Sequence, residues 1–199
     1  YVQVDPQVAR AVAQAVERLA QLGAQVEAVD PGFSDPLELF KTVVYAGAVD
    51  LARQLSSEQK DLLDPGLRRF TEQCQHTTLA HFTAAQEARA ALVARMNQFH
   101  SRYDLLVCPT MPITAFEAGH DVPPGSGLED WMKWSPLSYP FTLTQQPAAS
   151  LPCGFSSEGL PIGLQVVGAR FADDQVLRGC RAYEQAFPTT HPLAPIVKN

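Results

Sequence analysis

The chain has 199 residues, a length that fits one ordinary domain, and carries a formal net charge of −6. This acidic balance, with no basic group denser than Arg68–Arg69, argues against a nucleic-acid-binding module, which needs concentrated positive charge. No apolar run approaches the roughly 18 residues of a membrane-spanning helix, so we expect no membrane contact.

The N-terminal part is predicted to be mainly helical. Asp5 and Pro6 are a typical N-cap and first-turn proline, and apolar residues at helical spacing continue up to Gly23, which ends the helix. A short strand pattern follows, and a second helix begins at Pro36. The predicted elements are a helix over 5–23, a strand over 25–29, a helix over 36–55, a charged loop over 56–66 and a helix over 67–74.

The longest predicted helix covers residues 78–103. Its apolar stripe is interrupted by Arg89, which we expect either to pair with a buried carboxylate or to extend along apolar surface to water. His76 and His81 are five residues apart, about 140° around a helix, so they do not face one metal ligand site. A short buried strand is predicted over residues 104–107.

The four cysteines have no CxxC spacing and no histidine at ligand spacing, so we expect no zinc site. No phosphate-binding loop, dinucleotide fingerprint or calcium loop is present either, and we therefore expect no cofactor. Cysteines in such a chain are typical of buried thiols in a cytoplasmic protein. Two of them, Cys108 and Cys153, fall within predicted strands, which favours a structural role.

Residues 113–138 form a long irregular segment, and a loop of this length in a compact domain is usually functional or disordered. It contains both tryptophans, Trp131 and Trp134, whose large apolar area and single donor suit a substrate wall, a subunit contact or a cap over the core. Three of the carboxylates in this segment are either acid–base groups or, as we favour, an ordinary solvated surface: Asp121, Glu129 and Asp130.

The stretch from Tyr139 to Phe171 is the most apolar and least charged part of the chain. It contains two near-continuous apolar runs joined by turn residues, a pattern typical of strands covered on both faces. Gly163 and Gly168 mark a close backbone approach or a bend. The predicted elements here are a strand over 149–155, a strand over 160–167 and a helix over 173–187.

Two ordered blocks carry a further pattern: YDLLVCPTMP, and PFTLTQQPAASLPCGF followed by GLPIGLQVVG. They resemble the C-terminal signature of the amidase signature family, which is similar to P-F-N-x-T-G-x-P-A-x-S-x-P-x-G and G-L-P-x-G-x-Q-x-x-G. Thr142 stands where the family usually has Asn, and Gln145 stands where it usually has Gly. The matching positions in the second block are Pro140, Phe141, Thr144, Pro147, Ala148, Ser150, Pro152, Gly154, Gly159, Leu160, Pro161, Gly163, Gln165 and Gly168.

The resemblance implies an enzyme that hydrolyses or transfers across carboxamide C–N bonds through a Ser–cis-Ser–Lys triad and a loop rich in glycine and serine. This chain has no Gly-Gly-Ser-Ser-Gly run, and its Ser56–Ser57 and Ser156–Ser157 pairs lack the glycines that would aim N–H groups at an oxyanion. We therefore expect no catalytic residue in this chain. Residues 1–199 are interpreted as a single domain that forms the C-terminal half of a larger amidase-like domain.

The expected fold is α/β, with a mixed sheet of about four or five strands covered by helices, as in the C-terminal part of an amidase-signature-like α/β/α fold. A half-sheet leaves an unpaired edge or an uncovered face, so we also expect a homo-oligomer. The substrate is expected to be a small-molecule amide. The candidate residues of its binding wall are Trp131, Trp134, Tyr139 and Gln146.

Three functions remain open at this point. The first is the C-terminal part of an amidase-like hydrolase whose nucleophilic serine lies outside the chain. The second is a non-catalytic binding or assembly module. The third is part of an A-type subunit of a glutamyl-tRNA amidotransferase. The acidic balance and the Pro-Ala-Ala-Ser sequence favour a free-standing amidase.

Overall fold

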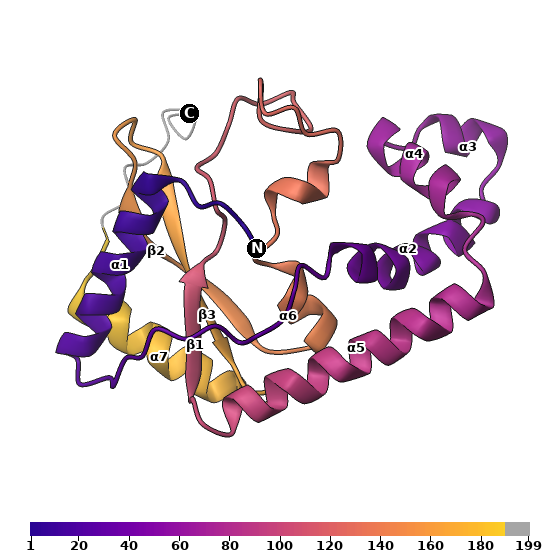
Figure 1. Ribbon diagram of the computed structural model, residues 1–199. Helices are drawn as coiled ribbons and strands as arrows, with labels where there is room; N and C mark the ends of the chain where they lie inside the picture. Colours follow the sequence, from indigo (N-terminus) through magenta and orange to yellow (C-terminus); the bar gives the residue numbers. More distant parts are fainter. Residues whose placement is uncertain (190–199) are drawn as a thin grey trace.

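The computed structural model describes residues 1–189 and divides into two regions, shown in Figure 1. A small sheet with helices on both sides forms one region, and a cluster of helices, α2 to α4, forms the other. The long helix α5 (Leu79–His100) runs past both. Among the described residues, no helix combines the length and the apolar character that a membrane crossing requires.

The sheet contains three strands in the order β1-β3-β2: β1 (Leu105–Pro109), β2 (Ala148–Phe155) and β3 (Pro161–Gly168). Both strand pairs are antiparallel, and a bulge interrupts β2 between Pro152 and Gly154. The α/β class is therefore confirmed. The described sheet is smaller than the expected four or five strands, and it is antiparallel instead of mixed.

The predicted strand over residues 25–29 is not part of this sheet. These residues form no regular element, and Val26 is 44% exposed. The Glu27 carboxylate accepts a hydrogen bond of 2.7 Å from the Tyr103 hydroxyl, so a side chain, and no strand ladder, ties this segment to the fold. An alternating pattern becomes a strand only where a neighbouring strand is available to pair with it.

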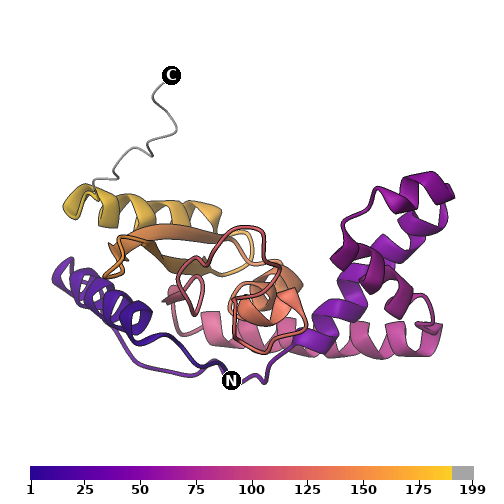
Figure 2. The same ribbon diagram turned by 90° about the horizontal axis from the view of Figure 1, so that it is seen from above.

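One face of the sheet is covered by α1 (Pro6–Gln21) and α7 (Asp173–Ala186). Leu164 of β3 and Tyr183 of α7 are both almost fully buried in the apolar cluster between them. The start of α1 follows the prediction, because the Asp5 carboxylate accepts hydrogen bonds from Gln7 N and Val8 N ahead of Pro6. Seen from above, α2 to α4 project away from this layered region (Figure 2).

The opposite face is covered by α5 and the short helix α6 (Tyr139–Thr144), a helix that was not predicted. Met96, Phe141 and Val167 form a second buried cluster there. Arg89 of α5 donates from Nε to the carbonyl of Leu143 at 2.8 Å. Its partner is therefore a backbone carbonyl near the C-terminus of α6, where a cation is favourable, and not a carboxylate.

The helical region comprises α2 (Leu37–Arg53), α3 (Ser57–Asp61) and α4 (Pro65–Cys74). The predicted loop over residues 56–66 is wrong, because it contains α3 and the start of α4. Ser56 and Gln59 form a capping box, and the Asp64 carboxylate accepts from Leu67 N. The helix predicted over 67–74 is confirmed as α4, which begins two residues earlier, whereas the five-residue α3 has too few apolar residues to leave a periodic signal.

Candidate functional site

A cavity of about 650 Å³ lies at the end of the sheet where β1 stops. We call it the sheet-end pocket. The loop that follows β1 contributes most of its lining, β2 and β3 contribute a smaller part, and α1 contributes Val8. The lining residues are Val8, Thr110, Met111, Ile113, Thr114, Ala115, Phe116, Trp134, Ser150, Pro152, Pro161, Ile162 and Gly163, all of them uncharged.

The polar side chains of the pocket lining are Thr110, Thr114 and Ser150, and two of their hydroxyl groups form a pair. Thr110 Oγ1 and Ser150 Oγ lie 2.7 Å apart and share a hydrogen bond. They fit around Gly163, because a Cβ atom on this residue would lie 2.7 Å from Ser150 Oγ and 2.8 Å from Thr110 Oγ1. The close approach predicted at Gly163 is therefore confirmed, and any side chain here would displace the hydroxyl pair.

One wall of the pocket comes from the segment that joins β1 to α6, residues 110–138, which we call the tryptophan loop. The rings of Phe116 and Trp134 meet edge to face, with 5.4 Å between their centroids. The indole Nε1 of Trp134 donates to the carbonyl of Asp121 at 3.0 Å. Trp134, one of the four wall candidates, thus lines this pocket with its polar atom already satisfied.

The other three candidates lie outside the sheet-end pocket. Trp131 is 39% exposed and lies beside Gly66 at the start of α4. A Cβ atom added to Gly66 would lie 3.7 Å from Cδ1 of the Trp131 indole. Tyr139 is buried, and its hydroxyl donates to Asp35 at 2.7 Å. Gln146 accepts from Thr144 Oγ1 and donates to the carbonyl of Gly168. Their role in a substrate wall stays a prediction.

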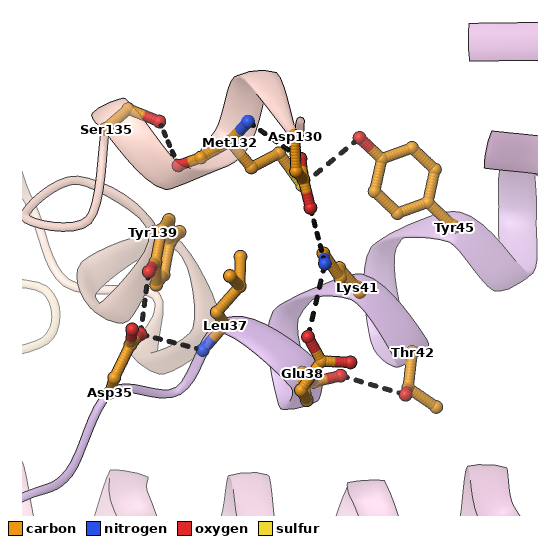
Figure 3. A network of polar contacts seen from close by, with 10 residues as sticks. All are labelled: Asp35, Leu37, Glu38, Lys41, Thr42, Tyr45, Asp130, Met132, Ser135 and Tyr139. Atoms are coloured by element: carbon orange, nitrogen blue, oxygen red, sulfur yellow. Dashed lines mark hydrogen bonds and ion pairs between the residues drawn. The ribbon is translucent and has the colours of Figure 1, made fainter. Parts of the chain in front are cut away.

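The tryptophan loop is bound to α2 by a network of polar contacts, shown in Figure 3. Lys41 Nζ lies 2.5 Å from Asp130 Oδ2 and 3.1 Å from Glu38 Oε1. The side chains of Lys41 and Asp130 are each only 17% exposed. Burial works against the charged form of Lys41, but hydrogen bonds to Asp130 and Glu38 outweigh it and raise the pKa of Lys41. The interpretation of Asp130 as part of a solvated surface is therefore wrong.

Within the described residues the pocket holds no activated nucleophile. Neither Thr110 nor Ser150 hydrogen-bonds to a histidine, lysine or carboxylate, the partners that would remove a hydroxyl proton. Burial raises the pKa of Cys153 to about 11, which disfavours its thiolate and agrees with a structural role. In residues 1–189 no group of histidine, cysteine and acidic side chains is placed to hold a metal ion.

The sequence interpretation missed three residues of this site: Lys41, Thr110 and Ser150. Thr110 and Ser150 belong to the two blocks of the amidase resemblance, but a pattern does not say which of its residues meet in space. Lys41 is the only lysine of α2, a largely apolar helix, and this isolation was the one feature of the sequence that could have marked it as a residue with a specific partner. Its partner is 89 positions away in the chain, so local spacing carries no information about the pair.

Comparison with known proteins identifies a family that this chain matches. A family model described as Amidase matches residues 1–177. The A-type subunit of the glutamyl-tRNA(Gln) amidotransferase of Picosynechococcus sp. is 33% identical over 210 residues, covering 92% of this chain and 42% of the relative. The chain therefore spans about two fifths of the length of this relative.

Solved structures agree with the family model. A crystal structure of an amidase has a TM-score of 0.80 at 26% identity and covers 92% of this chain and 42% of that one. The structure of 6-aminohexanoate cyclic dimer hydrolase complexed with substrate has a TM-score of 0.78 at 26% identity, with coverages of 94% and 42%. By sequence and by fold, the chain belongs to the amidase signature family.

Proposed function

We propose that the protein is an amidase that hydrolyses the C–N bond of small, uncharged carboxamides, and that the sheet-end pocket binds the apolar part of the substrate. The observation that carries this proposal is the lining of the pocket, which combines apolar side chains with the Thr110–Ser150 hydroxyl pair and the hydroxyl of Thr114 and has no charged group. A concave, mostly apolar site with a few fixed polar atoms suits a small neutral ligand.

The nucleophilic serine is proposed to lie outside these 199 residues, which then form the C-terminal half of a larger catalytic domain. Two observations support this placement. Neither pocket hydroxyl has a basic partner among the described residues, and the chain spans only 42% of the length of its relative. In this arrangement the chain supplies substrate binding, and the remainder of the enzyme supplies the nucleophile and its base.

The proposed reaction proceeds through an acyl-enzyme. The activated serine oxygen attacks the amide carbonyl, the tetrahedral intermediate expels the amine, and water then hydrolyses the ester. Trp134 and Phe116 would exclude water from the apolar part of the substrate. The Thr110–Ser150 pair can donate or accept through its free hydroxyl positions, which suits the N–H or the carbonyl of an amide.

A glutamyl-tRNA amidotransferase component is the second candidate, favoured by the 33% identity to the A-type subunit of Picosynechococcus sp.. Glutamine, the amide donor that this candidate would use, carries an ammonium and a carboxylate, and each needs a charged or strongly polar partner when it leaves water. The sheet-end pocket offers no charged side chain. We therefore rank the amidase first and the amidotransferase second.

The test uses a fluorophosphonate, which phosphonylates activated serines with loss of fluoride, followed by intact-mass spectrometry and amide hydrolysis assays. We expect the full-length enzyme to form a stoichiometric adduct and to hydrolyse benzamide and hexanamide, whereas the 199-residue chain forms no adduct. An adduct on the 199-residue chain would show that the nucleophilic serine lies within this chain and not outside it. Hydrolysis of glutamine in preference to both amides would favour the second candidate, and no hydrolysis at all would favour a non-catalytic module.

Self-association is proposed as well, through the sheet surface that α5 and α6 leave uncovered. Ala148 of β2 is exposed on this surface, and β1 and β2 are both edge strands of the described sheet. Such edges and faces pair readily with a second chain. Light scattering across a concentration series is the test, and a monodisperse monomer at the highest concentration would contradict the proposal.

A further inference from the structure

The tryptophan loop is attached to the rest of the molecule on both sides of Trp134. On the N-terminal side, Asp130 binds Lys41 of α2. On the C-terminal side, the attachment is made by two neutral groups: Gln165 Nε2, a buried amide of β3, donates to the carbonyl of Leu137 at 2.8 Å, and the Tyr1 hydroxyl donates to the carbonyl of Pro136 at 3.1 Å. Trp134 lies between these two attachments, so its position in the pocket wall depends on both.

The attachment to α2 is built around Asp130. One carboxylate oxygen, Oδ1, accepts from Met132 N at 2.9 Å and begins the short 3₁₀-helix η1 (Trp131–Trp134), while Oδ2 binds Lys41 (Figure 3). Met132 is 3% exposed, and its sulfur accepts from the Tyr45 hydroxyl at 3.5 Å. The carboxylate thus fixes the local helix and its docking on α2 at the same time.

The two attachments differ in kind. Gln165 is a neutral amide within the sheet, whereas Lys41 and Asp130 are two charges that are each only 17% exposed. Loss of Lys41 leaves the largely buried Asp130 carboxylate without its cation and draws it toward water. Loss of the Asp130 charge leaves Lys41 paired with Glu38 of its own helix and removes the ion pair that joins α2 to η1, so either substitution favours release of η1 from α2. The helical region contributes no residue to the lining of the sheet-end pocket, and yet it holds one end of the pocket wall.

We infer that Lys41 and Asp130 are positioning residues that set the place of the Trp134 wall, and with it the size of the amide substituent that the pocket accepts. This inference rests on the proposed function, since it takes the sheet-end pocket as the substrate pocket. Neither residue touches the substrate, and both act through the tryptophan loop. Substrate size selection is therefore controlled from a helix outside the pocket.

The first experiment measures the loop itself. Both tryptophans of the 199-residue chain lie in the tryptophan loop, so acrylamide quenching of tryptophan fluorescence reports on this loop alone. We expect Lys41→Met and Asp130→Asn each to raise the quenching constant about twofold, the double variant to add little, and Lys41→Arg to stay near wild type. Arg178→Met, which breaks the exposed Arg178–Asp174 pair, is the matched control and should change nothing.

The second experiment measures selectivity in the full-length enzyme. Lys41→Met and Asp130→Asn are expected to raise KM for benzamide about tenfold while leaving kcat and the acetamide kinetics nearly unchanged, with Lys41→Arg restoring most of the loss. An equal loss for both amides, or unchanged quenching in variants with native circular dichroism, would overturn the inference. If the wild-type enzyme hydrolyses neither amide, the proposed function fails, and the quenching result alone decides whether the pair positions the loop.

Discussion

The sheet region and the helical region hold their residues in place by different means. In the sheet region, twelve buried residues from α1, β2, β3 and α7 form one continuous apolar cluster. In the helical region the corresponding cluster has five, two of which, Met132 and Tyr139, come from η1 and α6, while Leu51 and Leu62 are more than half exposed. The part of the sheet-end pocket that β2 and β3 form, which we call its floor, is therefore fixed by burial. Its tryptophan wall depends on polar contacts to α2.

The largest expected effect compares matched leucines in the two regions. Leu164→Ala removes a side chain that is 0% exposed in the large cluster and should lower the free energy of unfolding by about 4 kcal/mol. Leu37→Ala, in the smaller cluster, should cost about 2 kcal/mol because its surroundings collapse more easily. Urea denaturation followed by circular dichroism measures both.

Leu62→Ala is the control for this pair, since Leu62 is 86% exposed and its truncation should stay within about 0.5 kcal/mol. If Leu37→Ala costs as much as Leu164→Ala, the two regions are equally well packed and the contrast drawn above is wrong.

The next effect concerns the floor of the pocket. Gly163→Ala places a Cβ within 2.8 Å of both hydroxyl oxygens, on a part of the sheet that cannot easily move, and should cost about 2 kcal/mol. Gly47→Ala in α2 has open space around the added methyl group and should instead stabilise by up to about 1 kcal/mol, because alanine is the better helix former. Equal effects of the two substitutions in urea denaturation would count against a rigid floor.

A smaller effect is expected from pH at the end of α5, the helix that joins the two regions. Burial lowers the pKa of His100 below its ordinary value of 6.5, and its Nε2 atom is buried without a partner. As the pH falls through about 6.5, His100 is therefore protonated in the unfolded chain before it is protonated in the folded one. This difference lowers the free energy of unfolding between about pH 6.5 and the lowered pKa of His100.

The measurement is the free energy of unfolding of the wild type and of His100→Asn between about pH 8 and about pH 5. The wild type should lose stability relative to the variant only below about pH 6.5. A difference that stays constant across this range would mean that His100 is protonated as easily in the folded chain as in the unfolded one.

The smallest effect concerns Gln145 at the end of α6. This residue adopts a left-handed conformation with φ 56° and ψ 41°, which glycine adopts without steric cost. Gln145→Gly should therefore stabilise by up to about 1 kcal/mol, less what is lost with the hydrogen bond from Arg170 Nη2 to the glutamine side chain. Thermal denaturation of the wild type and the variant measures this difference in stability. A decrease in Tm would show that the Arg170 contact contributes more than the backbone strain costs.

Several elements were predictable from the sequence because their signals are local. The Asp5–Pro6 start of α1, the strands β2 and β3 and the close approach at Gly163 all depend on residues within a few positions of one another. Gln145 stands where the amidase signature family usually has glycine, and the sequence does not say which backbone conformation it takes. The structure shows a left-handed backbone at this position, which is strained for glutamine and free of steric cost for glycine.

The family and the α/β class follow from the sequence alone, because two ordered blocks of proline, glycine and apolar residues carry the family pattern. The residues that form the pocket, and the contacts that hold its wall, become visible only in the folded chain. The Thr110–Ser150 contact spans 40 positions and the Lys41–Asp130 contact spans 89. Such pairs arise from packing between elements, which spacing along the chain does not encode.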